Sequence, residues 1–142
     1  MEPDFFKFVQ NNLLLFAVAV ISGAMLLWPL VRRVGGGPSV GAAEATRLIN
    51  REDALVVDVR DPGDYGAGHI LGAKSVPLGR IEASDVPGDV MKRKDKPVIL
   101  YCERGDRADK GAAALRKQGF TRVVSLSGGL AAWRQAGLPV QK

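Results

Sequence analysis

The stretch VILYCERGDRADKGAAALRKQGF, residues 98–120, joins an apolar run, a charged loop and a helix-like pattern. The apolar run, residues 97–102, is typical of a buried strand and ends at Cys102, the only cysteine in the chain. Four charged residues and one glycine follow, and residues 107–118 then predict a helix that ends at Gly119. The helix residues predicted to pack inward are Ala112, Ala113, Ala114 and Leu115. The sequence therefore places a lone thiol between a strand and a helix.

Short strands and helices alternate on both sides of this stretch. Further strands are predicted at 54–60, 73–77 and 122–126, and further helices at 42–51 and 128–137. Residues 61–70 are rich in turn formers with room for one helical turn, and residues 78–95 are predicted to be loop with short helical pieces. Continuously apolar strands that alternate with helices predict an α/β fold with a central parallel sheet covered on both faces.

The position of Cys102 suits a reactive thiol. In open parallel sheets, ligands bind at the carboxyl ends of strands, next to helix N-termini. Backbone N–H groups of the loop at 103–107 and the dipole of the following helix both favour a thiolate. Gly105 lets the loop turn tightly, and Arg104 and Arg107 add positive charge at its rim. The alternative is an inert buried cysteine, but the apolar residues stop at the thiol, which favours reactivity.

Composition narrows the classes of function. The chain has 142 residues, with 20 Lys+Arg against 15 Asp+Glu and a net charge of +5. A single cysteine excludes an intramolecular disulfide and a four-cysteine metal site, and His69 as the only histidine argues against zinc. The basic run KRKDK at 92–96 is interrupted by Asp95 and lacks interleaved aromatic residues. We interpret this run as a solvated loop and predict no nucleic-acid partner.

The first third of the chain has a different character. Residues 13–31, LLLFAVAVISGAMLLWPLV, carry no charge, and as a helix they would span ~28 Å, close to the ~30 Å hydrocarbon core of a bilayer. A cleaved signal peptide is the alternative, but the start MEPDFFKF carries Glu2 and Asp4, and the apolar run is longer than a typical signal core. The pattern therefore favours a retained membrane anchor.

Charges next to this run predict its orientation. Arg32 and Arg33 follow the apolar residues directly, so the positive-inside rule predicts that residues 32–142 face the cytoplasm. The chain is thus expected to be a single-pass protein of the inner (cytoplasmic) membrane. The predicted organisation is a tail at 1–12, a transmembrane helix at 13–31, a linker at 32–37 and a soluble domain at 38–142.

Four pieces of the soluble domain occur in the order seen in one known family. They are VVDVRDPGDYGAGHILGAKSVP (56–77), VILYCERGDRA (98–108), AAALRKQGFTRVVSLSGG (112–129) and AAW (131–133). Together they resemble the rhodanese family of sulfurtransferases over residues 38–140. The resemblance implies the rhodanese-like three-layer fold with a central parallel sheet. The added helix resembles that of single-domain bacterial rhodanese-like proteins with one N-terminal anchor.

The resemblance implies a chemistry for these residues. Cys102 would be the nucleophile that takes a sulfane sulfur from a donor, becomes a persulfide and passes the sulfur to a thiophilic acceptor, with no cofactor. The residues expected to bind substrate are Glu103, Arg104, Gly105, Asp106 and Arg107, whose backbone amides would cradle the persulfide. Asp58 and Arg60 match supporting positions. His69 is interpreted as a hydrogen-bonded packing residue, and Trp133 as core.

The charges of the loop qualify this expectation. Glu103 and Asp106 offset Arg104 and Arg107, so the formal charge of the loop is zero, and a dianion such as thiosulfate prefers a positive pocket. A low-molecular-weight or protein-bound persulfide is an equally good candidate donor. Without a second cysteine to receive the sulfur, the acceptor is expected to be another molecule, either a thiol or a protein.

Two other functions fit the same fold. A phosphatase of this fold would need a catalytic loop that is one residue longer, but the sixth position after Cys102 is Ala108 rather than arginine. A non-enzymatic module that holds a partner at the membrane is the second alternative, because a fold does not determine function. The presence of both Cys102 and Arg107 favours the sulfurtransferase.

Overall fold

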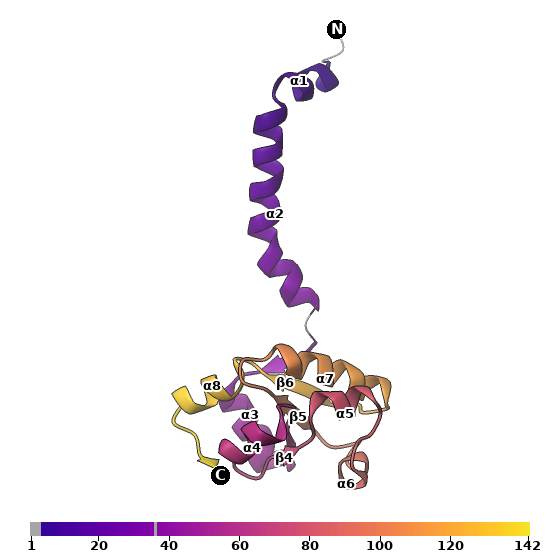
Figure 1. The fold of residues 1–142 in the computed structure, drawn as a ribbon, viewed down its shortest axis with the longest axis vertical. Coiled ribbons are helices and arrows are strands. Elements are labelled where there is room, and N and C mark those ends of the chain that lie inside the picture. The colour runs from indigo at the N-terminus through magenta and orange to yellow at the C-terminus, as the bar shows by residue number, and fades with distance from the viewer. Residues whose placement is uncertain (1–3, 36) are drawn as a thin grey trace. The chain divides into compact units, whose positions relative to one another are not determined.

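The computed structural model describes residues 4–35 and 37–142. The chain divides into two compact units, Met1–Gly36 and Gly37–Lys142 (Figure 1). Each unit is described by itself below.

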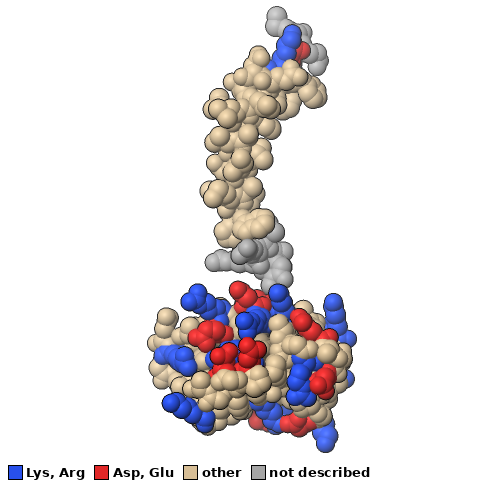
Figure 2. Space-filling model, viewed as in Figure 1, with Lys and Arg blue, Asp and Glu red and all other residues tan. Residues whose placement is uncertain are grey.

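The N-terminal unit consists of two helices, α1 (Phe5–Asn11) and α2 (Leu13–Gly35). Residues 13–30 of α2 are exposed, and the helix is long and apolar enough to cross a membrane, a test that a signal sequence also passes. Figure 2 shows no charged side chain along the described surface of this stretch. Helix α1 lies in the segment predicted to be a tail, and α2 continues through Gly35 into the predicted linker. Residues 1–3 and 36, and the side chains of Arg32 and Arg33, lie outside the described part.

The second unit is built on a five-stranded parallel sheet with the strand order β1-β6-β5-β2-β4. Its strands are β1 (Ser39–Val40), β2 (Leu55–Asp58), β4 (Lys74–Ser75), β5 (Val98–Tyr101) and β6 (Val123–Leu126). A separate antiparallel ribbon pairs β3 (His69–Ile70) with β7 (Val140–Gln141). The helices are α3 (Ala42–Glu52), α4 (Pro62–Ala67), α5 (Leu78–Glu82), α6 (Gly88–Met91), α7 (Asp106–Lys117) and α8 (Gly129–Gln135).

Two apolar clusters pack on the two faces of this sheet. Successive strand residues point to opposite faces, so Val56 and Ile99 join one cluster while Val57 and Leu100 join the other. The first cluster includes residues of α3 and α8, among them Trp133, and the second includes residues of α5, α6 and α7. This three-layer arrangement confirms the predicted α/β fold with a central parallel sheet.

The region around Cys102 follows the prediction closely, with one error. Helix α7 spans Asp106–Lys117, and Gly119 has a φ of +100° with its N–H bonded to the Arg116 carbonyl at 3.2 Å, a left-handed C-terminal stop. Ala113 is exposed, although it was expected to pack inward, because it lies about 100° around the helix from the buried Ala112. The predicted strands are shorter than expected, and strands β1, β3 and β7 were not predicted.

Candidate active site

Cys102 directly follows β5 and is almost fully buried, with 4% of its surface exposed. Its Sγ accepts a hydrogen bond from the backbone N–H of Gly105 at 2.9 Å. Gly105 has a φ of +118°, a conformation that glycine adopts readily, and it turns the loop so that this N–H faces the sulfur. Helix α7 begins at the next residue, Asp106. The loop thus holds the thiol beside a backbone donor and the N-terminus of a helix.

A pocket of about 430 Å³ opens at this thiol. It is lined by Arg60, Asp64, Cys102, Glu103, Arg104, Asp106 and Arg107. The structure therefore brings the predicted loop side chains together with Arg60, and it adds Asp64, which sequence reasoning missed. Three arginines and three carboxylates give the lining a formal charge of zero when the thiol is neutral. Gly105, the remaining predicted loop residue, contributes the backbone N–H that donates to the Cys102 Sγ.

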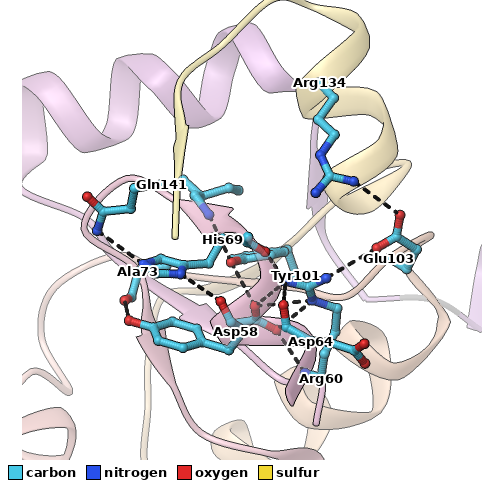
Figure 3. A network of polar contacts seen from close by, with 12 residues as sticks. Asp58, Arg60, Asp64, His69, Ala73, Tyr101, Glu103, Arg134 and Gln141 are labelled. Carbon is cyan, nitrogen blue, oxygen red and sulfur yellow. Dashed lines mark hydrogen bonds and ion pairs between the residues drawn. The ribbon is translucent and has the colours of Figure 1, made fainter. Parts of the chain in front are cut away.

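Asp58 and the pocket-lining Arg60 form a buried ion pair (Figure 3). Asp58 is fully buried at the end of β2 and accepts bonds from the backbone N–H of Arg60 at 2.9 Å and from its Nη2 at 2.7 Å. These hydrogen bonds raise the pKa of Arg60 above its already high value. The guanidinium is therefore charged and fixed in position, with 6% of the residue exposed.

Tyr101 connects this pair to the neighbouring ribbon. Its hydroxyl donates to Asp58 Oδ2 at 2.9 Å and accepts from the Ile70 N–H at 3.1 Å. Burial raises the pKa of Tyr101, so the phenol stays protonated as the donor that Asp58 needs. Sequence reasoning missed Tyr101, although a tyrosine that ends an otherwise aliphatic strand, opposite Asp58 in the sheet register, is a usable signal.

Helix α8 holds Cys102 and the start of the loop that follows it through two backbone hydrogen bonds. The N–H of Leu130 donates to the Cys102 carbonyl at 2.9 Å, and that of Ala131 to the Glu103 carbonyl at 3.2 Å. Gly129 makes this approach possible, because a Cβ there would lie 2.6 Å from the Glu103 oxygen and closer still to the Cys102 oxygen. Its φ of +61° also favours glycine. The first turn of α8 thus positions the peptide groups of the cysteine loop.

The order of these elements and the loop at the end of β5 match one family. The model of the rhodanese-like domain matches residues 41–136. The chain belongs to the rhodanese family.

Relatives of this rhodanese-like domain occur among both characterised and uncharacterised proteins. The uncharacterized protein YibN of Escherichia coli K12 is 45% identical over 97 residues, which cover 68% of this chain and 67% of YibN. A sulfurtransferase of Allochromatium vinosum is 38% identical over 96 residues, covering 66% of this chain and 84% of that protein. The NMR structure of the rhodanese-like domain of the Anabaena protein Alr3790 matches with a TM-score of 0.64 and 27% identity, covering 74% and 79% of the two chains.

His69 lies outside the pocket of this rhodanese-like domain. Its ring stacks on Tyr65 at 3.8 Å, its Nδ1 lies 2.8 Å from the Tyr65 carbonyl oxygen, and its Nε2 lies 3.1 Å from Nε2 of Gln141. The contacts are those of a hydrogen-bonded packing residue. Trp133 is likewise buried in the core, and its Nε1–H donates to the Pro139 carbonyl at 3.0 Å.

Replacing Tyr101 by phenylalanine is expected to lower the free energy of unfolding by about 1–3 kcal/mol, because Asp58 and the Ile70 N–H lose a buried partner. The raised pKa of Tyr101 means that its contribution is fully present below about pH 10, where unfolded tyrosine begins to ionise, and is lost as the pH rises further. Urea unfolding of both proteins between pH 7 and pH 11 should show the difference narrowing at the alkaline end. A difference that is constant with pH would contradict this assignment.

Proposed function

We propose that this protein is a sulfurtransferase that carries sulfane sulfur as a persulfide on Cys102. The observation that supports the proposal most is the position of the Cys102 Sγ, at a strand end in an open pocket, with the Gly105 N–H directed at it from 2.9 Å. A backbone donor at this distance stabilises negative charge on Sγ, both in the attacking thiolate and when Cys102 leaves as a thiolate in the second step.

The proposed reaction has two displacements at sulfur. In the first, the Cys102 thiolate attacks the sulfane sulfur of the donor, a new S–S bond forms, and the donor leaves with the electron pair of the broken bond as a thiolate or sulfite. In the second, a thiolate or cyanide acceptor attacks the outer sulfur, and the electron pair of the S–S bond returns to Cys102. Each step exchanges one bond at sulfur for another, so the cycle closes without a cofactor.

Further support comes from the family and from the loop length. A sulfurtransferase is among the relatives, with 38% identity. The phosphatase alternative is disfavoured because the sixth residue after the cysteine, Ala108, is a fully buried residue of α7 and cannot hold an oxyanion as arginine would. A non-enzymatic binding module at the membrane is the remaining alternative. A variant without the Cys102 thiol distinguishes it from a sulfurtransferase, because only the sulfurtransferase needs the thiol.

The steady-state test compares the wild-type protein with C102S. Sulfur transfer to cyanide from thiosulfate and from a low-molecular-weight persulfide should fall by a factor on the order of a thousand or more in C102S, because serine cannot carry the persulfide. Circular dichroism and the unfolding midpoint serve as controls for folding. Equal rates in both proteins would support the binding module.

We also propose that α2 spans the inner membrane and that residues 37–142 face the cytoplasm. The support is an uncharged, exposed stretch of spanning length at 13–30, followed in the sequence by Arg32 and Arg33. The partners are then a sulfur donor and a thiol or protein acceptor that meet the domain at the membrane surface.

Protease treatment of intact spheroplasts tests this orientation. The domain at 37–142 is expected to stay uncut until the membrane is permeabilised, and α2 should remain in the membrane fraction after an alkaline wash, as a retained anchor does. Digestion of the domain from the outside would contradict the orientation. Release of a shortened soluble chain would show a cleaved signal instead.

A further inference from the structure

A further cavity of the domain lies between α5 and α7. Its volume is about 500 Å³, and it shares no lining residue with the cysteine pocket. One wall belongs to α7, and the other is formed at and just after the end of α5. The residues of the two walls are Lys110, Ala113, Ala114 and Lys117 on α7, and Glu82 and Ser84 opposite them. We call this cavity the α5–α7 groove.

A hydrogen bond joins the two walls of the groove. Gln118, which also lines the groove, donates from its Nε2 to the Ile81 carbonyl oxygen of α5 at 2.8 Å. Figure 1 shows α5 alongside α7. The short side chains of Ala113 and Ala114 leave the space between the walls open, and Ala113 is exposed. The groove is therefore a formed concave surface with a fixed width.

Three cations follow the exposed side of α7 from the cysteine pocket into the groove. Arg107 lines the pocket, and Lys110 and Lys117 line the groove. At about 100° and 1.5 Å per residue, the three lie within about 80° of one another around the helix and span ~15 Å along it. All three are exposed, and none forms an ion pair among the described residues. We call them the α7 cations.

The acidic residues nearby do not neutralise these cations. Asp106 begins α7 at the pocket, and Glu82 stands on the opposite wall of the groove, but neither has an ion pair in the described part of the chain. Asp109 is half-buried and accepts a hydrogen bond from Ser125 Oγ. The groove therefore has two cations against one carboxylate, whereas the lining of the cysteine pocket has no net charge.

We propose that the α5–α7 groove docks an acidic polypeptide segment of a protein thiol acceptor, whose cysteine then reaches Cys102. The proposal rests on the proposed sulfur transfer, which needs an acceptor from outside because the chain has no second cysteine. Carboxylates of the segment lie beside Lys110 and Lys117, and the α7 cations lead from there to the pocket that opens at the thiol.

The shape of the groove favours a polypeptide over anionic lipid headgroups. A lipid surface contacts exposed cations but does not fill a concave site, and Glu82 on the second wall repels phosphate groups. A polypeptide segment that runs along α7 can place its carboxylates on the lysine side only. The alanine side chains leave room for its backbone.

Disulfide exchange with Cys102 measures docking without any sulfur transfer. The probes are cysteine peptides activated with 2-nitro-5-thiobenzoate. The Cys102 thiolate attacks the peptide sulfur, a mixed disulfide forms, and nitrothiobenzoate leaves with the electron pair of the broken bond. Cys102 is the only cysteine of the full chain, so release of the coloured thiolate reports this reaction alone.

Three peptides of equal length distinguish docking from general attraction. The distal peptide carries glutamates about four to six residues from its cysteine, ~13–20 Å away in an extended chain. They stand on both sides of the cysteine, so either chain direction places a set in the groove. The proximal peptide carries the glutamates next to the cysteine, and the neutral peptide carries glutamines instead.

We expect the distal peptide to react roughly five- to tenfold faster than the neutral peptide at low salt, and the proximal peptide about twofold faster or less. The ratio of distal to neutral rates, the distal ratio, cancels changes in thiol reactivity. K110Q/K117Q should lower the distal ratio to about twofold or less, and E82Q should raise it. High salt should shrink it.

Two variants separate the groove from net charge. R51Q/K92Q removes two exposed cations that have no ion pair among the described residues and line neither cavity, so it should change the distal ratio by less than about twofold. A113W keeps every charge but fills the groove, and it should lower the distal ratio. An equal loss in R51Q/K92Q and K110Q/K117Q, or a distal ratio that A113W leaves unchanged, would overturn the docking proposal.

Lysine labelling tests the lipid alternative. The full chain in phosphatidylcholine nanodiscs, with or without phosphatidylglycerol, is treated with an amine-reactive reagent and analysed by mass spectrometry. We expect Lys110 and Lys117 to be labelled equally in both membranes. Protection of these two lysines, but not of Lys92, only where phosphatidylglycerol is present would assign the α7 cations to lipid and contradict the docking proposal.

Persulfide transfer then tests the proposed function separately. If the disulfide ratios follow the expectation but Cys102 gains no sulfur from any donor, the groove stands and the proposed function fails. If the Cys102 persulfide passes its outer sulfur to the thiol forms of the distal and neutral peptides at equal rates, and the disulfide rates are also equal, the groove fails and the proposed function stands.

Discussion

Replacing Gly129 by alanine is expected to remove most of the reactivity of Cys102 and to lower the free energy of unfolding by about 2–5 kcal/mol. The new Cβ would lie 2.6 Å from the Glu103 carbonyl oxygen and closer still to that of Cys102, so α8 and the cysteine loop would have to separate. Separation breaks the bonds from Leu130 and Ala131 that hold these two carbonyls. The left-handed backbone at Gly129 adds about 1–2 kcal/mol of strain.

Gly137 supplies a matched control for this prediction. It also has a positive φ, +72°, but a Cβ there would meet no atom within 4 Å. G137A should therefore cost only the backbone strain, about 1 kcal/mol, and should leave the rate of Cys102 alkylation unchanged. Urea unfolding and iodoacetamide kinetics on both variants measure the two effects. If G129A were as stable and as reactive as G137A, α8 would not position the loop.

Replacing Asp58 by asparagine is expected to lower the free energy of unfolding by about 3–5 kcal/mol. Asp58 is fully buried and neutralises the guanidinium of Arg60, a residue that is itself only 6% exposed, so the loss of the carboxylate leaves a buried cation with an incomplete set of partners. The hydroxyl of Tyr101 loses its charged acceptor in the same step. The pocket should also lose the fixed orientation of Arg60.

Two further variants distinguish the ion pair from a general effect of mutation. D61N changes the next aspartate in the sequence, which is exposed and has no ion pair among the described residues, and should cost less than about 0.5 kcal/mol. D58N/R60M removes both charges and should recover part of the stability that D58N loses, because no cation is left unpaired. A double variant less stable than D58N would show that the Arg60 guanidinium stabilises the fold independently of Asp58.

Local patterns in the sequence predicted the part of the site that is built from residues close together in the chain. The apolar run that stops at Cys102, the glycine three residues later and the following helix-like pattern predicted a strand, a tight loop and a helix around the thiol. Each of these depends on neighbouring residues, and each was found at β5, Gly105 and α7. The Asp58–Arg60 contact also spans only two residues.

The remaining features depend on contacts between distant segments. The approach of α8 to the Cys102 carbonyl and the position of Arg134 beside Glu103 join residues about 30 positions apart, and no local periodicity reports them. The consecutive glycines at 128 and 129 were a signal of close backbone approach, but sequence reasoning interpreted them only as the start of a helix. Ala113 was placed inward because alanine fits either environment, so its identity carries little information about the helix face.

The central claim is that Cys102 carries the transferred sulfur, and the mass of the intact protein tests it most directly. After exposure to a sulfane-sulfur donor and removal of that donor, the wild-type protein is expected to gain the mass of one sulfur atom. Cyanide should then release this sulfur as thiocyanate, and C102S should gain nothing. A wild-type protein that stays unmodified by every donor that supports turnover, or an equal gain of sulfur by C102S, would contradict the account.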